Sequence, residues 1–184
     1  MDASLLGFSG LGEVYNLHPV FVHFPIALLP VSFLFYAIGW LRASQSAFFA
    51  GRACLGLATA GLALSVITGL RAEGGIPHND VIHRIMHTHE IVGFTVLGLS
   101  IVLLTWCSLR REHRPPAAPA FVAVLGVTAL LALQNADLGG RMVFVEGAGV
   151  KAAAIPVTAD SPAVPPPAEP PKHDHSSHKH SHKH

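Results

Sequence analysis

Residues 18–41 read HPVFVHFPIALLPVSFLFYAIGWL, a stretch without a single aspartate, glutamate, lysine or arginine. About 20 consecutive apolar residues are enough for a helix to cross the roughly 30 Å hydrocarbon core of a bilayer. Three more apolar stretches follow, and the predicted spans cover residues 20–41, 48–70, 91–109 and 120–136. The pattern predicts an all-α fold, an integral membrane four-helix bundle.

The composition supports this fold class. Hydrophobic residues make up 51% of the 184 residues and charged residues only 12%, which is too little charge for the surface of a soluble domain. The formal net charge of +1 also argues against nucleic-acid binding. There is no HExxH motif and no phosphate-binding glycine loop. We therefore expect a non-catalytic redox or metal-binding membrane subunit rather than an enzyme.

The chain divides into three parts. Residues 1–16 are predicted to be an N-terminal outer segment, and residues 17–150 the four-helix membrane domain. Residues 151–184 are rich in proline and histidine and have no apolar surface with which to pack, so they are predicted to form a disordered tail. Gly139 and Gly140 are predicted to turn the chain out of the fourth span, which would form a short glycine-rich outer segment.

The basic residues suggest an orientation in the membrane. Five of them flank the connections at one end of the bundle, against four at the other end and in the C-terminal segment, and the end with more Arg and Lys is expected to be cytoplasmic. Both termini are then predicted to lie on the opposite side. The five are Arg42, Arg52, Arg110, Arg111 and Arg114, and the four are Arg71, Arg84, Arg141 and Lys151.

Histidines cluster at the predicted outer end. His18 and His23 open the first span, and His89 opens the third. Histidine is the commonest metal ligand and is costly to leave unpaired at membrane depth, so a ligand site is predicted here. No Cys-x-x-Cys-His sequence is present, which excludes covalently attached haem, and the two cysteines are interpreted as packing residues.

A second set of side chains precedes the third span. His83, His87 and Glu90 fall at positions i, i+4 and i+7, so they share one helical face and could chelate a metal ion. His89 points about 160° away from His87 on the same helix and must serve a different neighbour.

The tail offers further metal ligands. Six histidines in its last twelve residues could bind zinc, nickel or copper in several alternative sets. They are His173, His175, His178, His180, His182 and His184.

Helix packing is also predicted from the small residues of the second span. Gly61, Ser65 and Gly69 recur every fourth residue and form a smooth stripe that another helix can approach closely.

Three segments carry a resemblance to a known family. The opening HPVFVHFPIALLP, the His89–Glu90 pair and the closing LGGRMVFVEGAGV resemble the bacterial membrane family called domain of unknown function 2231, over about residues 16–150. The resemblance implies a four-helix, multi-pass protein of the bacterial inner (plasma) membrane. Relatives fused to cytochrome c or Rieske iron–sulfur modules imply an electron-transfer setting, with a separate redox protein as partner here. By the same resemblance, His18, His23 and His89 match the motif histidines.

Three functions remain open on these grounds. The first is a b-type haem (haem b) ligated by His23 and His89, with Arg141 or Asp137 near a haem propionate, that passes single electrons. The second is binding or handling of a transition metal such as copper, zinc or nickel, to which the histidine-rich tail would contribute. The third is a structural subunit of a larger membrane complex. In each case the lipid bilayer is a partner and nucleic acid is not.

Overall fold

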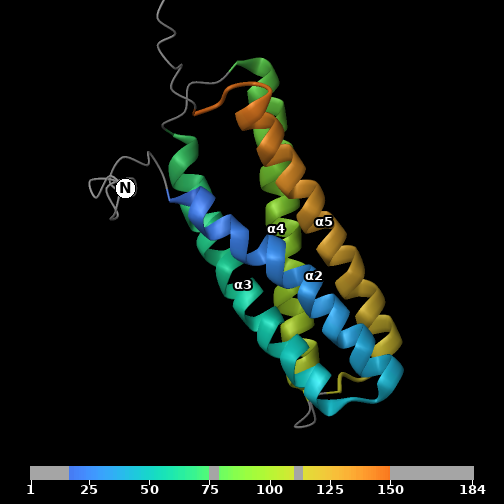
Figure 1. Ribbon diagram of the computed structural model, residues 1–184. Coiled ribbons are helices and arrows are strands. Elements are labelled where there is room, and N and C mark those ends of the chain that lie inside the picture. Colours follow the sequence, from blue (N-terminus) through green and yellow to red (C-terminus); the bar gives the residue numbers. More distant parts are fainter. Residues whose placement is uncertain (1–16, 75–78, 110–113, 150–184) are drawn as a thin grey trace, which may run out of the picture. The chain divides into compact units, whose positions relative to one another are not determined.

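The computed structural model describes residues 17–74, 79–109 and 114–149, and within them it contains four long helices and no strands (Figure 1). The helices are α2 (His18–Arg42), α3 (Gln45–Glu73), α4 (Asp80–Ser108) and α5 (Ala118–Phe144). Each is long and apolar enough to cross a membrane, with a mean hydropathy of 1.7 to 2.1 over its most apolar window. The predicted all-α membrane bundle is confirmed. The N-terminal segment and the tail with its six histidines lie outside the described residues.

Local sequence explains where the helices begin and end. Pro19 stands in the first turn of α2, where a missing amide hydrogen costs nothing. Ala43 adopts a left-handed conformation and ends α2. The hydroxyl of Ser44 then accepts a hydrogen bond from the Ala47 amide and caps α3. Asn79 caps α4 by accepting from the amides of Val81 and Ile82.

The helices run alternately up and down around the bundle. Consecutive helices pack against each other, which gives the pairs α2–α3, α3–α4 and α4–α5, and the last helix α5 also packs against α2. The pairs α2–α4 and α3–α5 are therefore diagonal. The beginnings of α2 and α4 and the ends of α3 and α5 lie at one end of the bundle, here called the histidine end (Figure 1).

Close packing between α2 and α3 depends on the small residues of α3. A Cβ atom on Gly61 would lie 2.8 Å from Cβ of Phe24, and one on Gly69 would lie 3.1 Å from Cε1 of His18. The predicted stripe of small residues on the second span is thus confirmed as a helix-packing surface, and α2 is the helix that it faces.

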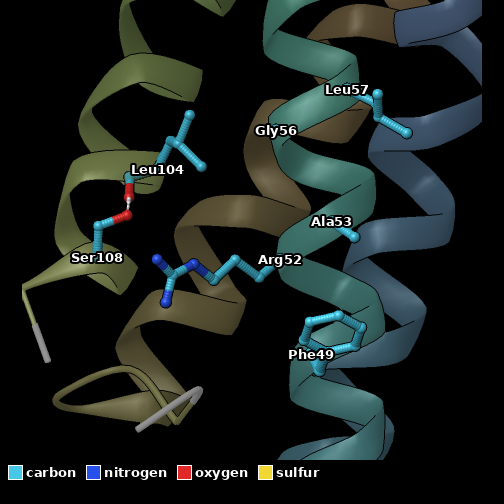
Figure 2. Close-up of a pocket in the computed structure, with 7 residues that line it drawn as sticks. All are labelled: Phe49, Arg52, Ala53, Gly56, Leu57, Leu104 and Ser108. Carbon is cyan, nitrogen blue, oxygen red and sulfur yellow. Dashed lines mark hydrogen bonds between the residues drawn. The ribbon is translucent and has the colours of Figure 1, made fainter. Parts of the chain in front are cut away.

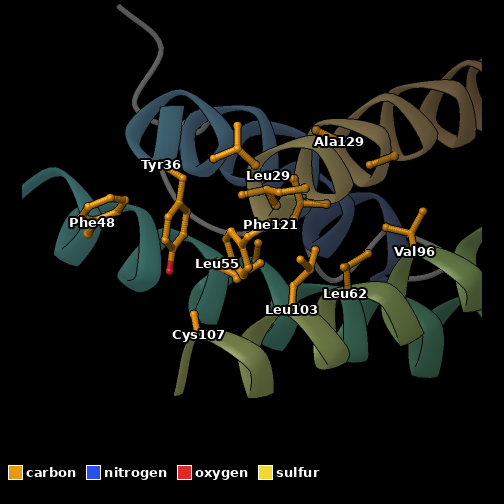
Figure 3. Packing of buried hydrophobic residues seen from close by; sticks show 14 residues of the cluster. Leu29, Tyr36, Phe48, Leu55, Leu62, Val96, Leu103, Cys107, Phe121 and Ala129 are labelled. Atoms are coloured by element: carbon orange, nitrogen blue, oxygen red, sulfur yellow. The ribbon is translucent and has the colours of Figure 1, made fainter. Parts of the chain in front are cut away.

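The core away from the histidine end is aromatic. Tyr36 lies with its ring centroid 4.6 Å from that of Phe121, and Trp106 contacts Phe121 edge to face at 5.7 Å. Ser32 is buried beside this cluster and donates a 2.8 Å hydrogen bond to the Gly51 carbonyl. Figure 3 shows how Tyr36, Phe121, Leu55 and Leu103 fill the space between the four helices.

One local prediction was wrong. Gly139 and Gly140 do not turn the chain, because α5 continues through both of them to Phe144. Positive φ angles occur instead at Gly147 and Gly149, at 70° and 72°. Phe144 is 89% exposed, so the residues after the two glycines do not pack back over the histidine end. A glycine in a membrane helix can serve close packing rather than a turn, and Gly139 lies against His89.

Candidate histidine site

Two histidines from diagonal helices meet at the histidine end. The ring centroids of His18 on α2 and His89 on α4 are 6.2 Å apart, and their planes are inclined at 81°. Both side chains are partly buried. Because α2 and α4 are not neighbours in the bundle, this contact spans its interior.

Each imidazole is held by a backbone carbonyl of the helix that follows it. His18 Nδ1 lies 2.8 Å from the Ser65 carbonyl oxygen on α3, and His89 Nδ1 lies 2.9 Å from the Asn135 carbonyl oxygen on α5. A carbonyl oxygen can only accept, so both Nδ1 atoms carry the proton and donate it. In the neutral ring the lone pair is then on Nε2, which is the arrangement that metal-ligating histidines use.

Polar and small residues complete the surroundings. The Thr68 hydroxyl donates to the Leu64 carbonyl and its oxygen lies 3.5 Å from His18 Nδ1. Asn135 Oδ1 is buried and has no hydrogen-bond partner among the described residues. A buried acceptor without a partner requires an explanation, such as a water molecule or a bound group beside it.

The other predicted ligands lie elsewhere. His23 is exposed, and its Nδ1 bonds to the Pro19 carbonyl of its own helix, so it is not part of the pair. His83 and His87 are exposed on α4, and Glu90 is partly buried. Asp137 and Arg141 are exposed on α5. Across the described ranges, no three histidine, cysteine, aspartate or glutamate side chains group closely enough to hold a metal ion.

The sequence could have indicated which histidine faces inward. His18 and His23 are five residues apart and so point about 140° apart on a helix. His18 continues the buried face of α2, which runs through Pro25, Leu29 and Ser32. The carbonyls of Ser65 and Asn135 had no comparable signal, because any residue has a carbonyl and only the fold decides which one is close.

A groove at the opposite end contains none of these residues. It has a volume of about 730 Å³ and opens between α3 and α4, where Arg52 extends toward Ser108 (Figure 2). Phe49 and Leu57 on its rim are 59% and 62% exposed, as expected for side chains that face lipid. The histidine pair is therefore the candidate site.

The comparison with protein families covers the region that contains both histidines. The model of the family described as "Predicted membrane protein (DUF2231)" matches residues 15–152, which is most of the chain. The protein belongs to the DUF2231 family. The resemblance found from the sequence is confirmed, and all four helices of the DUF2231 bundle, with His18 and His89, lie inside the matched region. No curated protein and no solved structure matches the chain.

Proposed function

We propose that this DUF2231 protein binds a b-type haem between His18 and His89 and takes part in single-electron transfer at the membrane. The observation that carries the proposal is the histidine pair itself: two imidazoles from opposite helices, 6.2 Å apart, each with Nδ1 anchored to a carbonyl. His18 and His89 would hold the iron through their Nε2 atoms, and the iron would supply the single-electron chemistry.

The donor chemistry fits haem iron. Both rings can present a neutral Nε2, and the carbonyl bonds fix their orientation, which raises the basicity of the ligand nitrogen. The unpartnered Asn135 Oδ1 would accept a hydrogen bond from a water or a protonated group beside the ligand.

The proposal replaces one ligand of the sequence hypothesis. His23 was expected to pair with His89, but His18 lies next to His89 and His23 is exposed. Arg141 and Asp137 lie on α5 beyond Asn135, so a role near a haem propionate stays a prediction for these two residues. Bound haem would supply the redox chemistry, and the protein would supply ligands, burial and orientation.

A bacterial inner-membrane location with the histidine end on the periplasmic side belongs to the same proposal. It rests on the excess of arginine near the opposite end, where Arg42 and Arg52 lie in α2 and α3. A cytochrome c or Rieske-type protein, or a larger membrane complex, would then exchange electrons at the histidine end.

The second candidate is transition-metal binding. It is favoured by the same pair, because two neutral imidazole donors suit copper, zinc or nickel as well as iron. Zinc normally takes four ligands, so it would need two more than this pair supplies. No further ligand groups with the pair in the described part of the chain, so the other two would come from the six histidines of the tail.

The test is a visible spectrum of the purified full-length protein, oxidised and dithionite-reduced, with metal analysis on the same sample. The proposal predicts a Soret band that shifts on reduction, lost in His18→Ala and in His89→Ala. His23→Ala is the matched control on the same helix and should keep the spectrum. A colourless protein with stoichiometric copper or zinc would overturn the haem proposal in favour of metal binding. A protein with neither would leave a structural subunit as the better account.

A further inference from the structure

We infer that α2–α3 and α4–α5 are two copies of one helix hairpin, related by an approximate twofold axis along the bundle that passes between His18 and His89. We further infer that Gly69 and Gly139, which occupy equivalent places in the two copies, are positioning residues for the two imidazoles. The first part stands on the fold alone. The second part rests on the proposed function.

The contacts of the site repeat from one hairpin to the other. His18 donates to a carbonyl 47 residues later, and His89 donates to one 46 residues later. One turn beyond each of these carbonyls stands a glycine. A Cβ on Gly69 would lie 3.1 Å from His18 Cε1, and a Cβ on Gly139 would lie 3.4 Å from His89 Cε1. Each hairpin thus supplies one imidazole, one carbonyl and one glycine.

The buried positions repeat in the same register. In the first helix of each hairpin, four buried residues beyond the histidine form pairs that, like His18 and His89, are 71 residues apart in the sequence. These pairs are Pro25 and Val96, Leu29 and Ser100, Ser32 and Leu103, and Tyr36 and Cys107. A fifth buried residue of α2, Gly39, has its equivalent outside the described residues.

The second helices repeat as well, with a spacing of 70 residues. Their buried pairs are Phe48 and Ala118, Gly51 and Phe121, Leu55 and Leu125, Ala58 and Thr128, Thr59 and Ala129, and Leu62 and Ala132. Ser65 and Asn135, whose carbonyls hold the histidines, have the same spacing.

Helical periodicity alone does not account for this agreement. Buried residues recur about every 3.6 residues on any helix, so two helices always match in some register. Here the buried residues give an offset of 71 residues between the first helices and 70 between the second helices. The two histidines and the two carbonyls that they contact give the same offsets, although burial does not define them. The same alignment places Leu55–Gly56 opposite Leu125–Gly126 and Arg71 opposite Arg141.

The helices are arranged as a twofold axis requires. Residues that lie near a twofold axis contact their own equivalents. The diagonal helices α2 and α4 contact each other through equivalent residues at both ends of the bundle. At the histidine end His18 lies against His89. At the other end the Tyr36 hydroxyl lies beside the Cys107 thiol (Figure 3). The symmetry is approximate, since α2 packs more extensively against α3 than α4 does against α5.

The axis has a consequence for the ligand. A metal centre held between the two histidines would receive the same donor, with the same carbonyl anchor, from each half of the protein. An alanine at Gly69 would then press on the His18 imidazole from the side of its Cε1 atom and displace it by a few tenths of an ångström. An alanine at Gly139 would meet His89 Cε1 at 3.4 Å, the near limit of ordinary contact, and would restrict that imidazole from the same side without forcing it to move.

The twofold arrangement is tested by spin-label distances in the full-length protein. With Cys54 and Cys107 replaced by alanine, labels are placed on Leu34→Cys and Val127→Cys in one protein, and on the equivalent Thr105→Cys and Leu57→Cys in another. A twofold axis exchanges the α2–α5 and α3–α4 neighbours, which pack to a similar extent. All four positions are exposed. We expect the two distance distributions to coincide. Distributions that do not overlap would overturn the inferred repeat, whether or not any ligand binds.

The positioning role is tested with haem as the probe, by the midpoint potential and haem occupancy of Gly69→Ala and Gly139→Ala. Gly56→Ala and Gly140→Ala are the matched controls, because a Cβ at either position meets nothing within 4 Å. We expect Gly69→Ala to shift the potential and to lose occupancy several-fold, Gly139→Ala to shift the potential in the same direction by less, and the controls to match the parent. Unchanged test variants in a haem-binding parent would overturn the positioning role and leave the proposed function intact. A parent without haem would overturn both, and the spin-label distances would still decide the repeat.

Discussion

Replacing Gly61 by alanine should separate α2 from α3. The new Cβ would lie 2.8 Å from Cβ of Phe24 and 3.2 Å from Cδ of Pro25. Neither atom can rotate away, because one is bonded directly to the backbone and the other belongs to a proline ring. The helices themselves must therefore move apart.

The expected cost follows from two opposing effects. Overpacking a well-packed interior costs about 1–3 kcal/mol, and the rigid neighbours here favour the upper part of that range. Alanine is a better helix former than glycine by about 0.5–1 kcal/mol, which offsets part of the loss. The net loss of unfolding free energy should be about 1–2 kcal/mol, which corresponds to a fall in Tm of a few degrees at roughly 2–4 °C per kcal/mol.

The measurement is thermal unfolding of the purified protein in a mild detergent, with Gly56→Ala as the control on the same helix. A Cβ on Gly56 meets nothing within 4 Å, so that variant keeps only the helix-forming gain and should be as stable as the parent or slightly more stable. Equal melting temperatures for the two variants would refute the close α2–α3 packing on which the position of His18 depends.

Three further variants test other parts of the molecule. Ser32→Ala removes the hydrogen bond to the Gly51 carbonyl and should lower the unfolding free energy by about 1 kcal/mol, measured by the same melts; no change would mean that this carbonyl finds another donor. Tyr36→Phe removes a buried hydroxyl that lies beside the Cys107 thiol, a weak hydrogen-bonding group, so we expect stability to change by no more than about 1 kcal/mol, and a larger loss would show that this contact is a strong hydrogen bond. Replacing the six tail histidines by alanine in the full-length chain should lower the amount of zinc or nickel bound in equilibrium dialysis and leave the visible spectrum unchanged; a lost Soret band would place the tail in the haem site.

The sequence predicted the helices well because membrane spans are set by hydropathy, which is local information. It did not predict their full length. The span expected to start at Ile91 belongs to a helix that begins at Asp80, and the span expected to end at Ala136 continues to Phe144. These extensions carry polar residues such as Arg84 and Arg141, so a search for apolar stretches does not detect them. A membrane helix can nevertheless continue into the aqueous region beyond the hydrocarbon core.

The sequence predicted where the histidines gather, and their function stays a prediction. Histidines at one end of the bundle could be seen in the sequence, and the choice between His18 and His23 depended on the direction of the buried face of α2. The anchoring carbonyls could not be predicted, because they depend on how two helices pack. A buried histidine in a membrane needs an acceptor for its Nδ1 proton, so the sequence could set this requirement without identifying the residue that meets it.

The repeated hairpin explains why the few polar groups of the interior lie where they do. If each half supplies one histidine and its carbonyl, a site at the shared axis needs no acidic residue and no third ligand from the protein, and the interior can otherwise stay apolar. The two halves differ in the core away from the histidine site. Gly51 in the first half corresponds to Phe121 in the second, and Tyr36 corresponds to Cys107. Large side chains from one half therefore fill the space left by small ones in the other. The histidines and glycines of the site are the same residue type in both halves. That contrast is expected if packing in the core required only a constant total volume, while the ligand required two equivalent donors.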